Sequence, residues 1–213
     1  MKFKEFCKKY ILRFPVIELI VFAVILFLDL LSKNLVAKAA KASGNPYGYS
    51  VDVIGSFLQI HYAENTGASF SLLADKPWAQ TFFLVLSGIV IPAFIVYLCF
   101  NRKKSLLLRI SLAMIITGAL GNFLDRAFLS YVRDFISFNF TPTYSFATFN
   151  VADSSLTIGV CLFILYAILD MVRESKAGKE IKNKKEEIKT ADNEPQTDSH
   201  CEEQRDEAIS NGR

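Results

Sequence analysis

Four long apolar runs divide the sequence, and each approaches the length that crosses a lipid bilayer as a helix. They cover residues 14–35, 78–100, 106–124 and 150–172. A helix needs roughly 20 residues to cross the hydrocarbon core of a bilayer. The second run contains no charged residue, whereas the first contains Glu18, Asp29 and Lys33. The pattern therefore predicts a mainly α fold built on a four-helix transmembrane bundle.

Clusters of lysine and arginine predict how these spans are oriented. One cluster precedes the first run, a second fills the short loop 102–104, and a third follows the fourth run at Arg173, Lys176 and Lys179. Four spans place all three clusters on one side, and the side rich in Lys and Arg is the cytoplasmic one. We therefore expect both termini in the cytoplasm. The loops 36–77 and 125–149 would then face outward from a bacterial cytoplasmic (inner) membrane.

The first outward loop has the alternation of a β-strand. Leu58, Ile60 and Tyr62 alternate with polar residues, and a similar alternation follows the Asn-Thr-Gly turn over residues 68–72. Alternation on both sides of an Asn/Gly turn is typical of a β-hairpin. We expect a small β-rich part at about residues 50–73, outside the membrane.

Composition separates the last part of the chain from the rest. The whole chain is 52% hydrophobic, which excludes wholesale disorder. Residues 175–213 contain no Leu, Val, Met or aromatic residue and cannot bury a core of their own. The sequence therefore predicts a membrane domain over 1–174 and a disordered cytoplasmic tail over 175–213. Because no basic face emerges, we expect no nucleic-acid partner.

Cysteine and histidine offer little chemistry. The four cysteines have no short spacing, so neither a zinc ribbon nor a disulfide framework is indicated. One of the two histidines, His200, lies in the polar tail, which leaves His61 in the strand-like run. We expect no metal site and no cofactor. Carboxylates are the acid–base groups that remain.

Ionisable residues inside apolar spans are costly and mark candidate sites. Asp29 and Lys33 are four residues apart, share a helix face and can pair near the outer end of the first span. A structural ion pair and a role in catalysis are both open for them. Glu18 lies nearer the cytoplasmic end, where we expect it to be solvated.

Amide and carboxylate side chains recur together at two outer helix ends. The third span ends with Asn122, Asp125 and Arg126 on one face, and the fourth begins with Asn150 and Asp153 on one face. Each group alone suits a helix cap or an ion pair, but the repetition on adjacent helices indicates a shared polar site. Two carboxyls held close together share a proton, which is the arrangement that aspartic proteases use.

The motifs taken together resemble those of the lipoprotein signal peptidases, also called signal peptidase II. The matching blocks, in order along the chain, are residues 28–33, 65–73, 118–126, 132–136 and 149–154. The resemblance covers roughly residues 14–172. It implies a four-helix membrane aspartic endopeptidase with a small extracytoplasmic β-rich cradle. Such an enzyme removes signal peptides from diacylglyceryl-modified bacterial prolipoproteins, cleaving just before the lipidated cysteine.

The resemblance also assigns site residues, residue by residue. Asp134 and Asp153 would be the catalytic pair at the outer membrane surface, one acting as base on water and the other as acid. The residues that would bind substrate or support the site are Asp29, Lys33, Asn65, Gly67, Asn122, Asp125, Arg126 and Asn150. The implied partners are the prolipoprotein and the bilayer, and we expect a monomer that uses no cofactor.

Several alternatives follow from the residues themselves. Asp125 could replace Asp134 in the pair, but its neighbours Asn122 and Arg126 favour a structural carboxylate. Ser130 and Arg133 stand where the family often has glycine and a small apolar residue, and we expect Arg133 to have little effect on Asp134.

The carboxylates at the outer helix ends would also suit a proton relay in a small transporter or channel. In an assembly subunit, they would only hold helices together.

Overall fold

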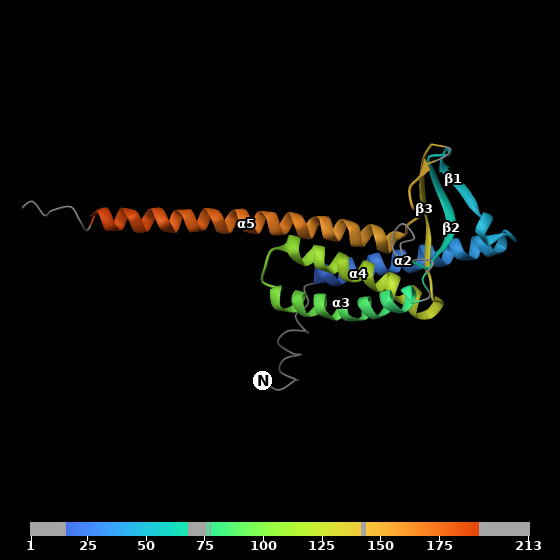
Figure 1. Ribbon diagram of the computed structural model, residues 1–213, viewed down its shortest axis with the longest axis horizontal. Coiled ribbons are helices and arrows are strands. Elements are labelled where there is room, and N and C mark those ends of the chain that lie inside the picture. The colour runs from blue at the N-terminus through green and yellow to red at the C-terminus, as the bar shows by residue number, and fades with distance from the viewer. Residues whose placement is uncertain (1–15, 68–75, 77, 142–143, 192–213) are drawn as a thin grey trace, which may run out of the picture. The chain divides into compact units, whose positions relative to one another are not determined.

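The structure is a computed structural model that describes residues 16–67, 76, 78–141 and 144–191. The chain divides into two compact units, 1–167 and 168–213. The described elements in chain order are α2 (Val16–Ala42), η2 (Pro46–Gly48), β1 (Ser50–Ile54), β2 (Leu58–Asn65), α3 (Ala79–Asn101), α4 (Leu106–Leu129), β3 (Val132–Thr141), β4 (Tyr144–Ser145) and α5 (Val151–Ala191). The expectation of a mainly helical fold is confirmed for this part of the chain (Figure 1).

Three described helices are long and apolar enough to cross a membrane. They are α3, α4 and the Val151–Ile181 part of α5. These helices coincide with three of the four predicted spans, 78–100, 106–124 and 150–172. The predicted span 14–35 is helical from residue 16 onward, within α2, but α2 is not among the three. That α2 also crosses the membrane stays a prediction.

Helix α4 is the central helix of the first unit. It packs against α2 and α3, and Ser155 of α5 donates its hydroxyl to the Met114 carbonyl of α4 at 3.0 Å. Gly121 of α4 permits this packing, because a methyl group there would lie 3.0 Å from Ala152 Cβ and 2.5 Å from Asp29 Oδ2. Close approach through small residues is typical of helices packed within a membrane. The polar residues of α2, α4 and α5 are thereby brought within hydrogen-bonding distance.

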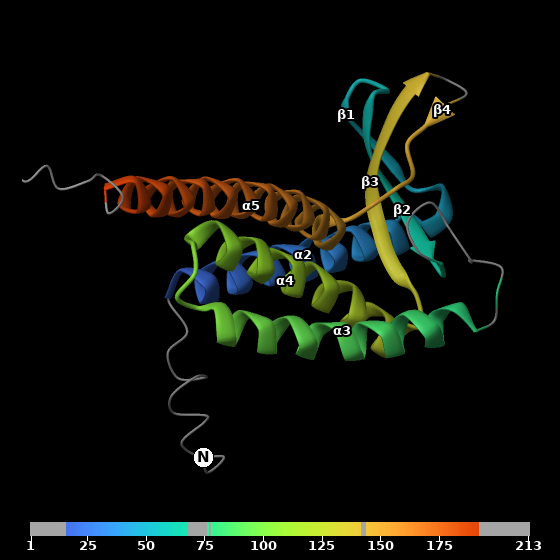
Figure 2. The same ribbon diagram turned by 60° about the vertical axis from the view of Figure 1, so that its left-hand side comes forward.

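The strands form one sheet with the order β1-β2-β3-β4, antiparallel throughout. Figure 2 shows the sheet at one end of the helices, and β3 contacts both α2 and α4 there. The predicted strand at 58–62 is confirmed by β2. Its expected hairpin partner, residues 68–72, lies outside the described residues, and β2 pairs instead with β1 and β3. The sequence predicted a loop over residues 125–149, but Val132–Thr141 in this range is the longest of the described strands.

The expectation that Glu18 is solvated is wrong. Its side chain is 2% exposed and accepts a hydrogen bond from Arg109 Nε, in an ion pair between α2 and α4. Buried charges persist where a partner of opposite sign compensates for the lost hydration. The two residues are 91 positions apart, so no helix periodicity could connect them.

Helix α5 continues to Ala191, whereas disorder was expected from residue 175. Residues 175–191 are rich in Lys, Glu and Ala, which have high helix propensity, and the first proline of the tail is Pro195. A segment can therefore be helical without burying a core. Residues 192–213 lie outside the described part of the chain, and the predicted domain boundary at 174/175 stays a prediction.

Candidate active site

The candidate site lies where the sheet meets the ends of three helices. Residues from β2, β3, α4 and α5 line it, and α2 supports it from behind. The structure brings all ten residues of the sequence hypothesis into one connected region of the first unit, through hydrogen bonds, ion pairs or electrostatic contact.

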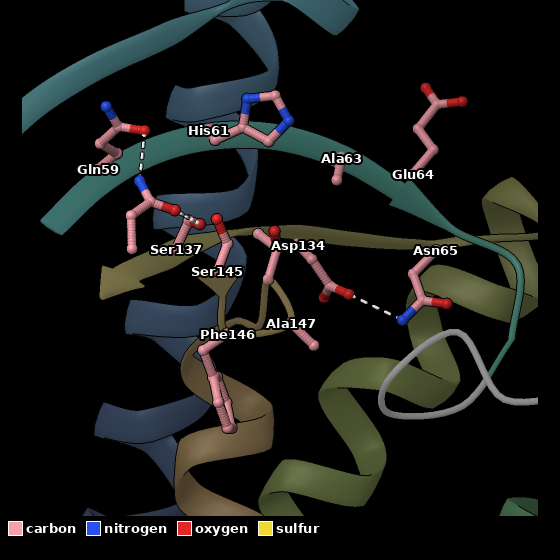
Figure 3. A pocket seen from close by; sticks show the side chains of 12 residues that line it. Gln59, His61, Ala63, Glu64, Asn65, Asp134, Ser137, Ser145, Phe146 and Ala147 are labelled. Atoms are coloured by element: carbon pink, nitrogen blue, oxygen red, sulfur yellow. Dashed lines mark hydrogen bonds between the residues drawn. The ribbon is translucent and has the colours of Figure 1, made fainter. Parts of the chain in front are cut away.

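Asp134 is the third residue of β3 and is 2% exposed. The sequence placed it in an outer loop, but it lies on a paired strand, opposite Ala63 of β2. Its two carboxyl oxygens accept separate hydrogen bonds, one from Asn150 Nδ2 at 2.7 Å and one from Asn65 Nδ2 at 2.9 Å. Figure 3 shows the bond from Asn65. The carboxyl is thus fixed in orientation by strand pairing and by two amides.

Asn150 and Asp153 cap the beginning of α5 reciprocally. Asp153 N–H donates to Asn150 Oδ1 at 2.9 Å, and Asn150 N–H donates to Asp153 Oδ2 at 3.2 Å. This exchange satisfies main-chain donors that a helix start leaves without partners. It also fixes the Asp153 carboxyl against the residue that binds Asp134.

Asn122 of α4 connects the two sides of the site. Its Nδ2 donates to Asp153 Oδ1 at 2.7 Å. Its Oδ1 accepts from Asn150 Nδ2 at 3.1 Å and from Lys33 Nζ at 3.1 Å. The sequence periodicity had placed Asn122 on the face of Asp125 and Arg126, and only the packing of α4 against α5 reveals its contact with Asp153.

Lys33 and Asp29 hold the site from α2 and are almost fully buried. Lys33 Nζ lies 2.8 Å from Asp29 Oδ2, as the spacing predicted, and 3.4 Å from Asp125 Oδ2. Asp29 Oδ1 accepts the Ala152 N–H of α5 at 2.9 Å. The pair therefore connects α2 to both α4 and α5, and it does not reach the candidate catalytic carboxyls directly.

Arg126 and Gly67 form the edge of the site that faces α3. Arg126 Nη2 donates to the Gly67 carbonyl at 3.0 Å, and its guanidinium lies 5.3 Å from the centre of the Phe83 ring. Asn65 Oδ1 accepts the Gly67 N–H at 2.8 Å. Asn65 therefore holds Asp134 with its amino group and the Gly67 turn with its carbonyl group.

Arg133 is the site residue whose importance the sequence did not indicate. Its side chain turns away from Asp134 and forms an ion pair with Asp125, Nη2 to Oδ1 at 2.6 Å. Asp125 was expected to be a structural carboxylate beside Asn122 and Arg126 on its own helix, but its described hydrogen bonds come from Arg133. Consecutive strand residues point to opposite faces, which separates Arg133 from Asp134.

The electrostatics of the site centre on Asp134. Burial, followed by the neighbouring Asp153 carboxylate, raises the pKa of Asp134 to about 7. The hydrogen bonds from Asn65 and Asn150 favour the ionised form and oppose part of this rise. The carboxyl of Asp134 therefore keeps a proton to a higher pH than an exposed aspartate does.

Two cavities meet at Asp134. One, of about 470 Å³, runs between α3, α4 and α5, with Phe83, Leu156 and Ile158 along it and Asp153 at its polar end. The other, of about 500 Å³, opens over the sheet and contains His61 (Figure 3). The first cavity is lined mainly by apolar side chains and the second mainly by polar ones. The two together would suit a bound peptide that changes from apolar to polar along its length.

The described residues contain no group of three or more His, Cys, Asp or Glu side chains arranged to hold a metal ion. The chemistry available from those residues is that of two buried carboxyls and the amides around them. Two adjacent carboxyls that differ in protonation can act as base and acid. Fold and site together fit a multi-pass membrane protein with acid–base chemistry at one end of its helices.

Comparison with known proteins identifies the family to which the chain belongs. The family model described as signal peptidase (SPase) II matches residues 21–169. The lipoprotein signal peptidase of Enterococcus faecalis is 37% identical over 80% of this chain and 97% of its own. That of Staphylococcus aureus is 35% identical over 82% of this chain and 99% of its own. The chain belongs to the signal peptidase II family.

A solved structure agrees with this result. A bacterial membrane enzyme determined by the in meso method superposes with a TM-score of 0.64 at 32% identity, over 74% of this chain and 91% of that one. The predicted resemblance is therefore confirmed, and the chain is a peptidase by family. The residues that carry out catalysis are not assigned by these similarities.

Proposed function

We propose that the chain is an aspartic endopeptidase of the bacterial cytoplasmic membrane. Its substrates would be diacylglyceryl-modified prolipoproteins, which it would cleave just before the lipidated cysteine. The observation that carries the proposal is that Asp134 and Asp153 line one cavity and are joined through the single residue Asn150. The name shared by the curated relatives, lipoprotein signal peptidase, supports the substrate class.

In this mechanism, the two carboxyls of Asp134 and Asp153 carry one proton between them. The ionised carboxyl takes a proton from a water molecule, which attacks the carbonyl carbon of the scissile peptide bond. The protonated carboxyl donates its proton to the carbonyl oxygen, and the tetrahedral intermediate then collapses with proton transfer to the leaving amine. Either carboxyl can begin as the base, because each has amide donors that fix its orientation.

The charges around the site support a singly protonated pair. The network contains the carboxylates Asp29, Asp125, Asp134 and Asp153 and the cations Lys33, Arg126 and Arg133. One proton on the pair therefore makes the network neutral. A neutral buried network avoids the cost of an uncompensated charge. The state required by the mechanism is thus the state that the surrounding charges favour.

The other site residues have positioning roles in this proposal. Asn150 and Asn122 orient the pair, whereas Asp29, Lys33 and Asp125 hold the helices that carry them. Asn65 and Arg126 line the apolar cavity, and Gly67 is hydrogen-bonded to both, so these three residues would bind the main chain of the substrate. Their hydrogen bonds to one another in the absence of substrate are the ones that a peptide main chain would replace.

The proposed topology has four spans, with α2 as the first, and both termini in the cytoplasm. The sheet then forms an extracytoplasmic cradle, and the carboxyl pair lies at the outer membrane surface. The basic loop 102–104 between α3 and α4 supports this orientation. A substrate anchored in the same bilayer is held at a fixed depth, which raises its effective concentration at the site.

The proposal is tested with the purified full chain in detergent. A diacylglyceryl-modified prolipoprotein and the same precursor without the lipid are incubated with it, and products are identified by mass spectrometry. We expect cleavage of the lipidated precursor only, with a new N-terminus at the modified cysteine. If a known signal peptidase II cleaves the precursor and this folded chain does not, the proposed function is wrong.

A further inference from the structure

Arg133 binds the Asp125 carboxylate of α4 through both its side chain and its main chain. Its Nη2 donates to Asp125 Oδ1 at 2.6 Å and its Nε to Asp125 Oδ2 at 3.2 Å. The Arg133 N–H donates to the same Oδ2 at 3.0 Å. Two parallel bonds from a planar guanidinium fix both distance and orientation, which a point charge cannot do. Asp125 is 2% exposed and Arg133 11%, so water screens this pair little.

The same guanidinium also reaches α2. Arg133 Nη1 donates to Asn34 Oδ1 at 2.7 Å, and Asp125 Oδ2 lies 3.4 Å from Lys33 Nζ. The second residue of β3 is therefore fixed to two helices at once. Strand pairing adds a third attachment, because Arg133 lies opposite Glu64 of β2, but it does not connect the strand to a helix.

The main chain of Arg133 is held on its carbonyl side by α5. Asn150 Nδ2 lies 3.4 Å from the Arg133 carbonyl oxygen and donates to Asp134 Oδ1 at 2.7 Å. Asp125 thus fixes the N–H of Arg133, and Asn150 its carbonyl group. The two peptide groups that flank Arg133 are therefore both held, and the second of them carries Asp134.

We propose that Arg133 is a positioning residue that fixes the start of β3 against α4 and thereby aims the Asp134 carboxyl at Asp153. This inference rests on the proposed function, because it assigns Asp134 to the catalytic pair. Arg133 itself does not reach the reacting atoms. It acts through the main chain of β3. Without the two hydrogen bonds of its guanidinium to Asp125, the start of β3 is held less firmly and Asp134 can move away from Asp153.

The test variant is Arg133→Lys, which keeps the charge and removes the two-pronged contact. Purified wild type and variant are compared for kcat and KM on a diacylglyceryl-modified prolipoprotein across pH, and their Tm is recorded. We expect kcat to fall on the order of tenfold or more with KM nearly unchanged, since small misplacements of a catalytic group are costly. The matched control is Arg173→Lys, the same substitution at an exposed arginine of α5 outside the site, which should leave kcat unchanged.

The pH profile separates positioning from a merely structural role. The titratable and charged groups that face Asp134 or the Arg133 contact are Asp153 of α5, Asp29 and Lys33 of α2, Asp125 and Arg126 of α4, and His61 and Glu64 of β2. None of them changes charge in Arg133→Lys. If Asp134 moves outward in the variant, it becomes less buried and lies farther from Asp153. Both effects then raise its pKa less than they do in the wild type. The high-pH limb of the rate profile should then move to lower pH.

The outcomes distinguish the two proposals. A wild type that does not cleave refutes the proposed function. A wild type that cleaves, with an Arg133→Lys variant of equal kcat and the same pH profile, refutes the positioning role alone. A lower Tm with kcat and profile unchanged after correction for folded protein also refutes it. If Arg133→Lys does not fold, Arg133→Gln takes its place, and an unchanged kcat in folded protein is the refuting result.

Discussion

Asn150 donates its side-chain amide to the Asp134 carboxyl at 2.7 Å, while its main-chain N–H donates to the Asp153 carboxyl at 3.2 Å. One residue before α5 therefore connects a strand carboxyl to a helix carboxyl. Asp134 and Asp153 are 19 positions apart in sequence and come from different elements. Asn150 thus bridges the two carboxyls, with its side chain on one and its main chain on the other.

Replacement of Asn150 by Ala removes the amide that joins the pair. We expect Asn150→Ala to lower kcat on the order of a hundredfold, because the carboxyl of Asp134 loses a fixed orientation. Loss of the helix cap should also destabilise the protein by about 1 kcal/mol, measurable as a lower Tm. Asn139→Ala is the control, since the described hydrogen bonds of the Asn139 side chain are with Gln59, Ser56 and Ser137 and none is with either aspartate. Equal kcat in both variants would contradict this role.

The raised pKa of Asp134 predicts how the folded state responds to pH. Its pKa is about 7 in the folded protein, against an ordinary value of 3.8, so between these values the folded state binds more protons than the unfolded state. Stability therefore falls as pH rises from about 4 to about 7, by at most roughly 4 kcal/mol. In Asp134→Asn this contribution is absent. Thermal unfolding in detergent should show the advantage of the variant growing over that range, and parallel curves would refute the prediction.

Gly121 is predicted to tolerate no side chain. A methyl group there would lie 2.5 Å from Asp29 Oδ2 and 3.0 Å from Ala152 Cβ. We expect Gly121→Ala to cost about 1–3 kcal/mol by overpacking and to lower Tm. Gly88→Ala in α3 is the matched control, because its methyl group would meet only Phe123 at 3.8 Å, an ordinary contact. Similar Tm values for the two variants would show that α4 and α5 do not pack through Gly121.

Ser130 carries backbone strain at the end of α4. Its φ is +67°, in the left-handed region that costs a residue with a side chain about 1–2 kcal/mol. Glycine adopts this conformation freely, although it loses more entropy on folding. Ser130→Gly should therefore raise Tm slightly and leave kcat unchanged. A lower Tm would indicate that the Ser130 side chain contributes a stabilising contact.

The sequence predicted the helices well and the tertiary contacts poorly. The apolar runs identify α3, α4 and α5 because burial in lipid requires about 20 apolar residues and leaves a simple pattern. The i, i+4 spacing likewise predicts the Asp29–Lys33 pair, which the structure shows at 2.8 Å. Both signals are local, and the physics that produces them acts within one element.

Long-range contacts leave no such signal. Arg133 was expected to have little effect on Asp134, because consecutive residues need not face each other, and nothing in the sequence connects it to Asp125 and Asn34. Glu18 was expected in solvent because it lies near the cytoplasmic end of its span, and its partner Arg109 lies on another helix. The strand β3 was missed because its aromatic and polar residues resemble an interfacial loop. In each case the contact depends on how the elements pack, which one sequence does not specify by periodicity.

The central claim is that Asp134 and Asp153 together cleave the substrate without a metal ion. The most direct measurement follows cleavage of a diacylglyceryl-modified prolipoprotein by gel shift, with a chelator present, for wild type, Asp134→Asn and Asp153→Asn. The account predicts full cleavage by wild type and a loss of activity in each folded variant. Retained cleavage by either variant, or loss of wild-type activity to the chelator with recovery on adding metal, would contradict it.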